Sequence, residues 1–175
     1  MFDDLLKRIG LGRQVEKPVQ EQPTVLVPDG TISYKPALVA DLLSDHQDLL
    51  RMFQELVASH KKGDFDACVA KLKAFADILR SHLLKENLHL YVYLKHSLQH
   101  DPESSELMKS MRTEMGTIGR TLNRFVTRYT TTPWDAQTRA ALGSELESIA
   151  DVLVRRIAQE EKLLYPMYMP PSSYR

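Results

Sequence analysis

The sequence predicts an all-α fold, an up-down-up-down antiparallel four-helix bundle preceded by a short helix and an extended arm. Apolar residues recur at three- and four-residue spacing through four long stretches, which is the spacing of one helix face. Short connections with Gly or Pro separate these stretches, so consecutive helices are expected to run antiparallel. No pair of segments shows a convincing strand pattern that would compete with this interpretation.

Residues 1–35 are expected to lie outside the bundle. The segment Phe2–Ile9 carries apolar residues at helical spacing, and Gly10 is a plausible end for that short helix. Residues 11–35 hold three prolines and a Pro-Asp-Gly turn signal, which is typical of an extended arm. This arm could dock a protein partner or a second copy of the chain, or it could fold back on its own bundle.

The bundle itself is expected over residues 36–168, followed by a tail over 169–175. Its four helices are predicted at about 36–61, 64–99, 104–130 and 134–165. Pro36 and Pro133 are expected near helix starts, Asp64 is an expected N-cap, and Pro166 should end the last helix.

Composition excludes several classes of function. The chain has 23 acidic and 23 basic residues, so it offers no electrostatic case for nucleic acid or for an anionic membrane. No apolar run is long enough for a membrane span, and the N-terminus lacks the pattern of a secretory signal. The single Cys68 has no partner for an internal disulfide, which fits a reducing compartment. A cytoplasmic protein is therefore expected.

The stretch 79–93 carries the main chemical signal. His82 and Glu86 are four residues apart within an apolar helix face, which is how a bundle presents metal ligands inward. The last helix repeats the pattern with Arg156 and Glu160, and a Leu-Tyr pair follows each glutamate at the same offset. The first and third helices also align, His46 with Met115. The chain thus reads as two similar helical hairpins related by a pseudo-twofold axis.

With these residues, the chain resembles the hemerythrin-like, HHE-type cation-binding domains over roughly residues 36–168. The most specific piece is the run from Arg156 to Pro166, which is similar to the family's His-x-x-x-Glu-Glu followed by Leu-Tyr/Phe-Pro. The family binds two non-haem irons bridged by two carboxylates and uses them in dioxygen or nitric oxide chemistry, sensing or iron handling. The resemblance implies that His46, His82, Glu86 and Glu160 fall on metal-ligand positions.

Met115 and Arg156 fall on the family's two remaining histidine positions. The guanidinium of Arg156 stays protonated and has no lone pair to offer, so it repels a cation. We therefore expect one iron ion rather than two, and the same ligands suit Zn(II) or Mn(II). In the alternative, the bundle binds no metal and serves as an interaction module, with Arg156 alone neutralising Glu86 and Glu160 in a bidentate pair.

His89 and Glu161 are possible additional ligands, but each has a simpler interpretation. His89 lies two turns beyond His82 and could add to the site, but it is first a satisfied or half-exposed histidine. Glu161 is expected to point aside, although a change of helix phase would exchange its role with that of Glu160. The residues include no phosphate-binding loop and no nucleophile motif, so the sequence favours binding of a metal and of O2 or NO over catalysis.

Overall fold

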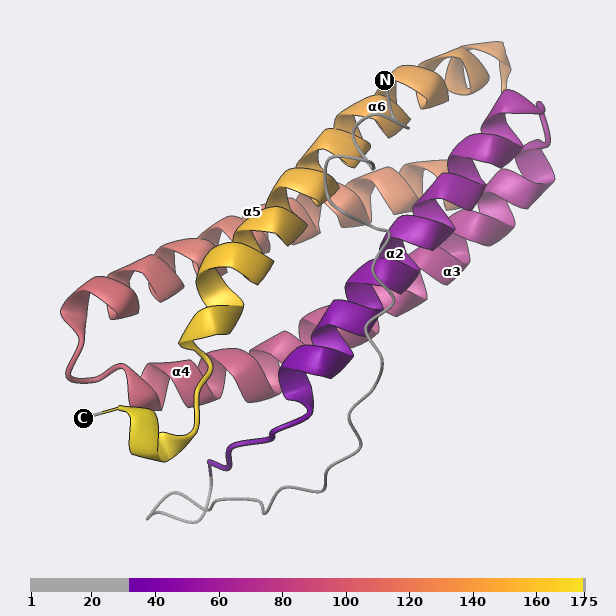
Figure 1. The fold of residues 1–175 in the computed structure, drawn as a ribbon. Helices are drawn as coiled ribbons and strands as arrows, with labels where there is room; N and C mark the ends of the chain where they lie inside the picture. The colour runs from indigo at the N-terminus through magenta and orange to yellow at the C-terminus, as the bar shows by residue number, and fades with distance from the viewer. Residues whose placement is uncertain (1–31, 175) are drawn as a thin grey trace.

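The computed structural model describes residues 32–174, and this part of the chain forms an antiparallel bundle of four long helical rods (Figure 1). This confirms the predicted all-α fold. The predicted helix over residues 1–9 lies outside the described residues. The principal elements are α2 (Leu38–Lys61), α3 (Phe65–Lys85), η1 (Glu86–Leu90), α4 (Tyr91–Ser97), α5 (Pro102–Thr131), α6 (Ala136–Gln159) and η2 (Glu160–Leu164).

Aspartate side chains fix where three of the rods begin. Asp64, Asp101 and Asp135 each accept a hydrogen bond from the backbone N–H three residues further on, which satisfies one of the free donors of a helix N-terminus. The prediction placed Asp64 correctly. It placed the last rod's start near Pro133, two residues before the Asp135 cap.

The second rod is continuous but not uniform. It begins as α3, widens into the single π-helical turn η1, and resumes as α4. The fourth rod does the same, because α6 passes into the π-helical turn η2 before the 3-10 turn Tyr165–Met167. Each π turn begins at one of the two matched glutamates, Glu86 and Glu160. The internal repeat of the sequence therefore has a counterpart in backbone geometry, and π turns are often found at functional sites.

A polar layer divides the buried side chains into two hydrophobic clusters. We call them the distal core, at the end with the α2–α3 and α5–α6 loops, and the terminal core, at the end where the described chain begins and ends. On α2, Leu42 belongs to the terminal core and Leu49 to the distal core, with His46 between them. The other buried polar residues of the layer are His82, Glu86, Arg156 and Glu160.

Both described ends of the chain pack against the terminal core. The ring of Tyr34 stacks on that of Tyr168 with centroids 5.0 Å apart, and the backbone N–H of Lys35 donates to the Tyr168 hydroxyl at 2.8 Å. The Tyr174 hydroxyl donates to the carbonyl of Met167, which holds the C-terminal residues against the bundle. The segments on either side of the predicted bundle, as far as they are described, are thus part of its packing.

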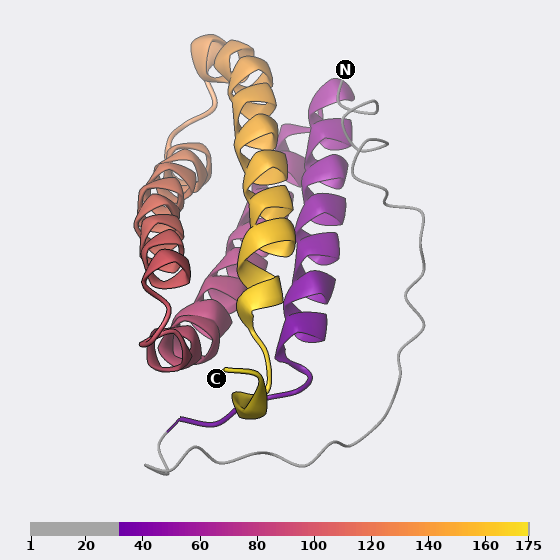
Figure 2. The ribbon, with the colours of Figure 1, turned by 60° about the vertical axis from the view of Figure 1, so that its left-hand side comes forward.

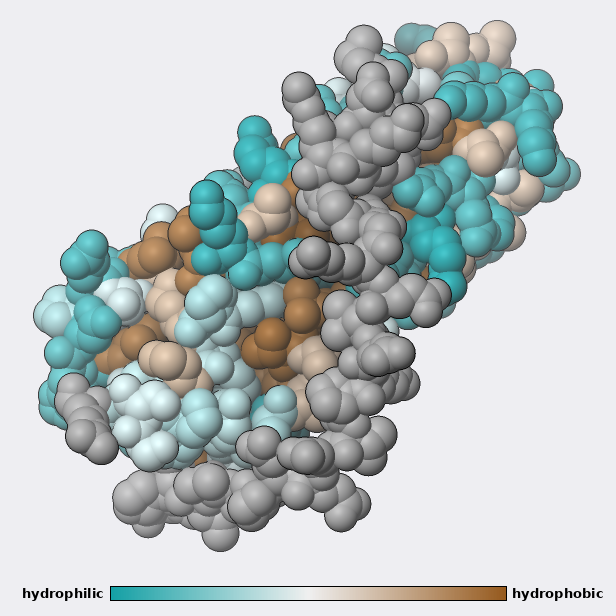
Figure 3. All heavy atoms as spheres, viewed as in Figure 1, coloured by the Kyte–Doolittle hydropathy of each residue, from teal (hydrophilic) through white to brown (hydrophobic). Residues whose placement is uncertain are grey.

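The face drawn in Figure 3 carries both hydrophilic and hydrophobic side chains. Hydrophilic side chains dominate the end of the bundle where α2 turns into α3, and hydrophobic side chains show between the helices (Figure 3). None of the helices in residues 32–174 is long and apolar enough to cross a membrane.

In the view of Figure 2, α6 lies beside α2, and contacts join these two helices directly. This adjacency brings His46 against the end of the fourth rod.

Candidate metal centre

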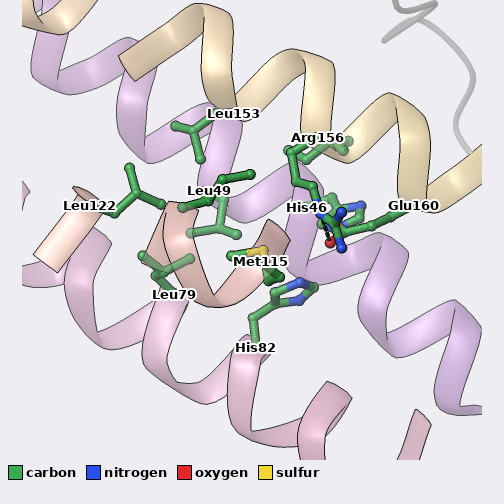
Figure 4. A pocket seen from close by; sticks show the side chains of 11 residues that line it. His46, Leu49, Leu79, His82, Met115, Leu122, Leu153, Arg156 and Glu160 are labelled. Carbon is green, nitrogen blue, oxygen red and sulfur yellow. Dashed lines mark hydrogen bonds and ion pairs between the residues drawn. The ribbon is translucent and has the colours of Figure 1, made fainter. Parts of the chain in front are cut away.

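The polar layer collects side chains from three of the four rods. His46 comes from α2, His82 from α3, Arg156 from α6 and Glu160 from η2, and they point towards one another in Figure 4. None of these four is more than 3% exposed, and Glu86 is fully buried. Burial of so many polar groups costs free energy unless they pair with one another or with an ion.

Three of these residues form a group that could hold a metal ion. One ligand atom each from His46, His82 and Glu160 lie within 4.8 Å of one another. Two atoms bound to the same ion at about 2.1 Å are about 3.0 to 4.2 Å apart, so these side chains would have to move closer together before all three could bind one ion. The three residues also line a cavity of about 20 Å³, which has room for one water-sized occupant.

Hydrogen bonds orient the imidazole of His46. Its Nδ1 lies 2.9 Å from Glu161 Oε1, and its Nε2 lies 3.2 Å from Glu160 Oε2. Burial alone would lower the pKa of His46, but the hydrogen bonds to Glu160 and Glu161 outweigh it and raise the pKa to about 9. The metal-free His46 is therefore protonated at neutral pH. Glu161 acts by orienting this ring, an arrangement that accompanies most metal-bound histidines.

His82 has a similar carboxylate neighbour. Its Nδ1 lies 3.4 Å from Asp45 Oδ2, in an alignment that makes no hydrogen bond in the metal-free layer. Asp45 is held in turn by Lys85, whose Nζ lies 2.7 Å from the same oxygen. Burial, followed by the charge of His46, lowers the pKa of His82 to about 4, so this ring is neutral and able to act as a ligand.

Glu86 carries a buried oxygen without a partner. Its Oε1 accepts a hydrogen bond from the Tyr165 hydroxyl at 3.3 Å and lies 3.8 Å from His82 Nε2. Its Oε2 has no hydrogen-bond partner among the described residues. Burial and the neighbouring charge of Glu160 raise the pKa of Glu86 to about 8. An unsatisfied, buried carboxyl oxygen in this layer fits a bound cation, although Glu86 lies outside the group of ligand atoms that His46, His82 and Glu160 form.

Arg156 occupies the other half of the layer. Its Nε donates to Glu160 Oε1 at 2.6 Å, Nη1 to Glu114 Oε2 at 3.3 Å, and Nη2 to the Tyr91 hydroxyl at 3.2 Å. The expected bidentate pairing of Arg156 with both Glu86 and Glu160 is wrong. Arg156 donates to Glu160, but its two terminal nitrogens donate to Glu114 on α5 and to Tyr91 instead. Although burial acts to raise the pKa of Glu160, His46 and Arg156 together lower it.

The internal repeat extends to these contacts. Asp45 approaches His82 in one half of the layer, and Glu114 contacts Arg156 in the other half. When the two hairpins are aligned in sequence, Asp45 corresponds to Glu114 and His82 corresponds to Arg156. The two acids were visible in the sequence directly before His46 and Met115, but side chains of adjacent helical residues point in different directions, and they were not assigned to the site.

The remaining residues considered in the sequence differ in whether they take part in the polar layer. Met115 is buried and lines the same cavity as the two imidazoles. His89 is half-buried and faces Lys35, whose Nζ lies 3.0 Å from its Nε2, so the structure does not bring it into the cluster. Cys68 is buried in the distal core, where burial raises the pKa of its thiol.

A family model for the hemerythrin HHE cation-binding domain matches residues 37–168. The chain belongs to this family. No curated protein and no solved structure gives a significant match. Membership of the HHE family makes cation binding the expected property of the domain, and the buried His46, His82 and Glu160 form a group that could hold a metal ion.

Proposed function

We propose that this HHE domain binds a single non-haem metal ion in its polar layer, with His46, His82, Glu86 and Glu160 as ligands. Two imidazoles and two carboxylates suit Fe(II), and they also accept Zn(II) or Mn(II). Iron is the metal expected from the family. The observation that carries the proposal is the convergence of His46, His82 and Glu160 on one buried cavity, from three separate helical rods.

Arg156 is the reason for proposing one ion rather than two. Its guanidinium already donates to Glu160 Oε1 and supplies one permanent positive charge in the half of the layer that lacks imidazoles. A second cation there would face this charge without a nitrogen ligand, since Met115 and Arg156 replace both histidines. The guanidinium thus stands in for the second metal ion of the family.

The proposed role is to sense or buffer the metal, or to bind a small diatomic molecule such as O2 or NO. Four protein ligands leave positions open on an ion that prefers six. The cavity of about 20 Å³ that three of these ligands line has room for one water-sized occupant, so it is too small for an organic substrate. The unpaired Cys68 supports placement in a reducing compartment such as the cytoplasm.

Metal content tests this proposal directly. Untagged protein purified from iron-supplemented cells is expected to contain close to one metal ion per chain by elemental analysis. His46→Ala and His82→Ala should each reduce that content, whereas Arg156→His should raise iron towards two per chain. A wild-type content near zero, after reloading with Fe(II), Zn(II) and Mn(II), would overturn the proposal. A content near two would overturn its mononuclear form.

The second candidate is a metal-free interaction module. It is favoured by the Arg156–Glu160 ion pair at 2.6 Å, which lets the layer exist without any bound cation. Its docking elements would be the segment Phe2–Ile9, outside the described residues, or the tail Pro170–Arg175, joining a protein partner or a second copy. Near-zero metal, with Arg156→Ala more damaging to folding than His82→Ala, would favour this candidate.

A further inference from the structure

The π turns determine where two tyrosines point. In η1 the backbone N–H of Tyr91 donates to the carbonyl of Glu86, and in η2 that of Tyr165 donates to Glu160, each five residues back. An α-helix would bond residues four apart and turn these tyrosines away from the glutamate's face. The wider turn brings them back to it. Both tyrosines are consequently buried beside the polar layer, 1% and 4% exposed.

The two hydroxyl groups reach opposite halves of the layer. The Tyr91 hydroxyl accepts a hydrogen bond from Arg156 Nη2 at 3.2 Å. The Tyr165 hydroxyl lies 3.1 Å from His46 Nε2 and donates to Glu86 Oε1 at 3.3 Å. One tyrosine oxygen therefore faces the guanidinium cation. By the pseudo-twofold relation, the other faces the place where the metal cation is proposed.

These distances are those of neighbouring ligands. At metal–ligand bonds of about 2.1 Å, adjacent ligand atoms are separated by about 3.0 Å in an octahedron and about 3.4 Å in a tetrahedron. The Tyr165 oxygen falls within this range of both His46 Nε2 and Glu86 Oε1. A phenol oxygen so placed is close enough to both side chains to bind the same ion as they do.

We propose that the Tyr165 hydroxyl oxygen is a further ligand of the metal ion, an inference that rests on the proposed function. With a divalent ion it binds as a neutral phenol and keeps its hydrogen bond to Glu86. Were a ferric ion bound, the oxygen would coordinate it as phenolate, and the O–H proton would pass to Glu86 Oε1, the atom to which the hydroxyl already donates. The site then carries a tyrosine oxygen in addition to two imidazoles and two carboxylates.

Optical spectroscopy of iron-loaded protein tests the inference. Wild-type protein loaded with ferric citrate and desalted should show a visible phenolate-to-iron charge-transfer band, with tyrosinate vibrations enhanced in resonance Raman spectra. Tyr165→Phe should abolish the band and weaken metal binding about tenfold or more. Tyr91→Phe is the matched control, since it removes a buried hydroxyl from the Arg156 half and should leave the band in place.

The possible failures can be told apart. Wild-type protein that holds iron but shows neither the band nor tyrosinate vibrations would overturn the Tyr165 ligand and leave the proposed function intact. Protein that holds no metal would overturn both. Equal loss of the band in the two tyrosine variants would also count against Tyr165 as a ligand. If Tyr165→Phe fails to fold by circular dichroism, the resonance Raman spectrum of the wild type decides the question.

Discussion

The buried ion pair between Arg156 and Glu160 gives the sharpest prediction for stability. In metal-free protein, Arg156→Met removes the guanidinium with little change in volume and leaves the Glu160 carboxylate, 2% exposed, without its 2.6 Å partner. Breaking a buried pair from one side costs about 3–5 kcal/mol. Because protonated His46 stays 3.2 Å from the other carboxylate oxygen, we expect about 3 kcal/mol. For a chain of this size that lowers the melting temperature by roughly 6–12 °C.

Arg128 provides the matched control. Its Nη1 is also 2.6 Å from a glutamate, Glu145, but the arginine side chain is 48% exposed, so Arg128→Ala should cost about 0–1 kcal/mol. Thermal and urea unfolding at pH 7, with chelator present, measure both variants. The double variant Arg156→Met/Glu160→Gln should recover part of the loss, because no buried charge is left unpaired. An Arg156→Met cost no greater than that of Arg128→Ala would refute the reasoning.

Three further predictions follow from the polar layer. The raised pKa values of His46, about 9, and Glu86, about 8, mean that the folded metal-free state holds protons that the unfolded state releases. Its stability should therefore fall as pH rises from about 6.5 to about 9; urea midpoints independent of pH would contradict this. Metal binding must displace the same protons, so the metal affinity should increase over the same interval, as competition with a chelator would measure. Asp45→Ala should weaken metal binding roughly 10- to 100-fold by releasing the His82 ring, while Asp48→Ala, an exposed acid on the same helix, should leave affinity unchanged. Equal effects of the two aspartate variants would count against an orienting role.

The rods of the fold could be predicted because their apolar spacing is long and regular. Local details that depend on a single side chain or backbone turn were harder to predict. Pro133 looked like a helix start, yet the chain reaches its first helical turn only at Ala136, after Asp135 has capped it. The π turns have no signature in residue spacing, because a widened turn is selected by what the following residues contact.

The same π turns limited how much of the site could be predicted from the sequence. Helix phase placed His46, His82, Glu86 and Glu160 on inward faces, and all four are buried in the polar layer. It did not place Glu161 against His46, and it gave Tyr165 no part in the site. Both contacts lie in or directly after η2, where the inserted residue rotates the chain relative to an α-helix. A phase computed for a regular helix cannot include that rotation.

The division of the interior by the polar layer has a consequence for cooperativity. Helices α2 and α6 cross the layer, but the apolar packing on its two sides is separate, so the terminal core can open as a sub-global unit while the distal core stays closed. Amide hydrogen exchange should therefore be faster around Leu42 than around Phe53 in metal-free protein. An ion that links rods at the layer would join the two units into one. Occupancy of the centre should thus also slow exchange in the segment Ile32–Lys35, which packs on the terminal core.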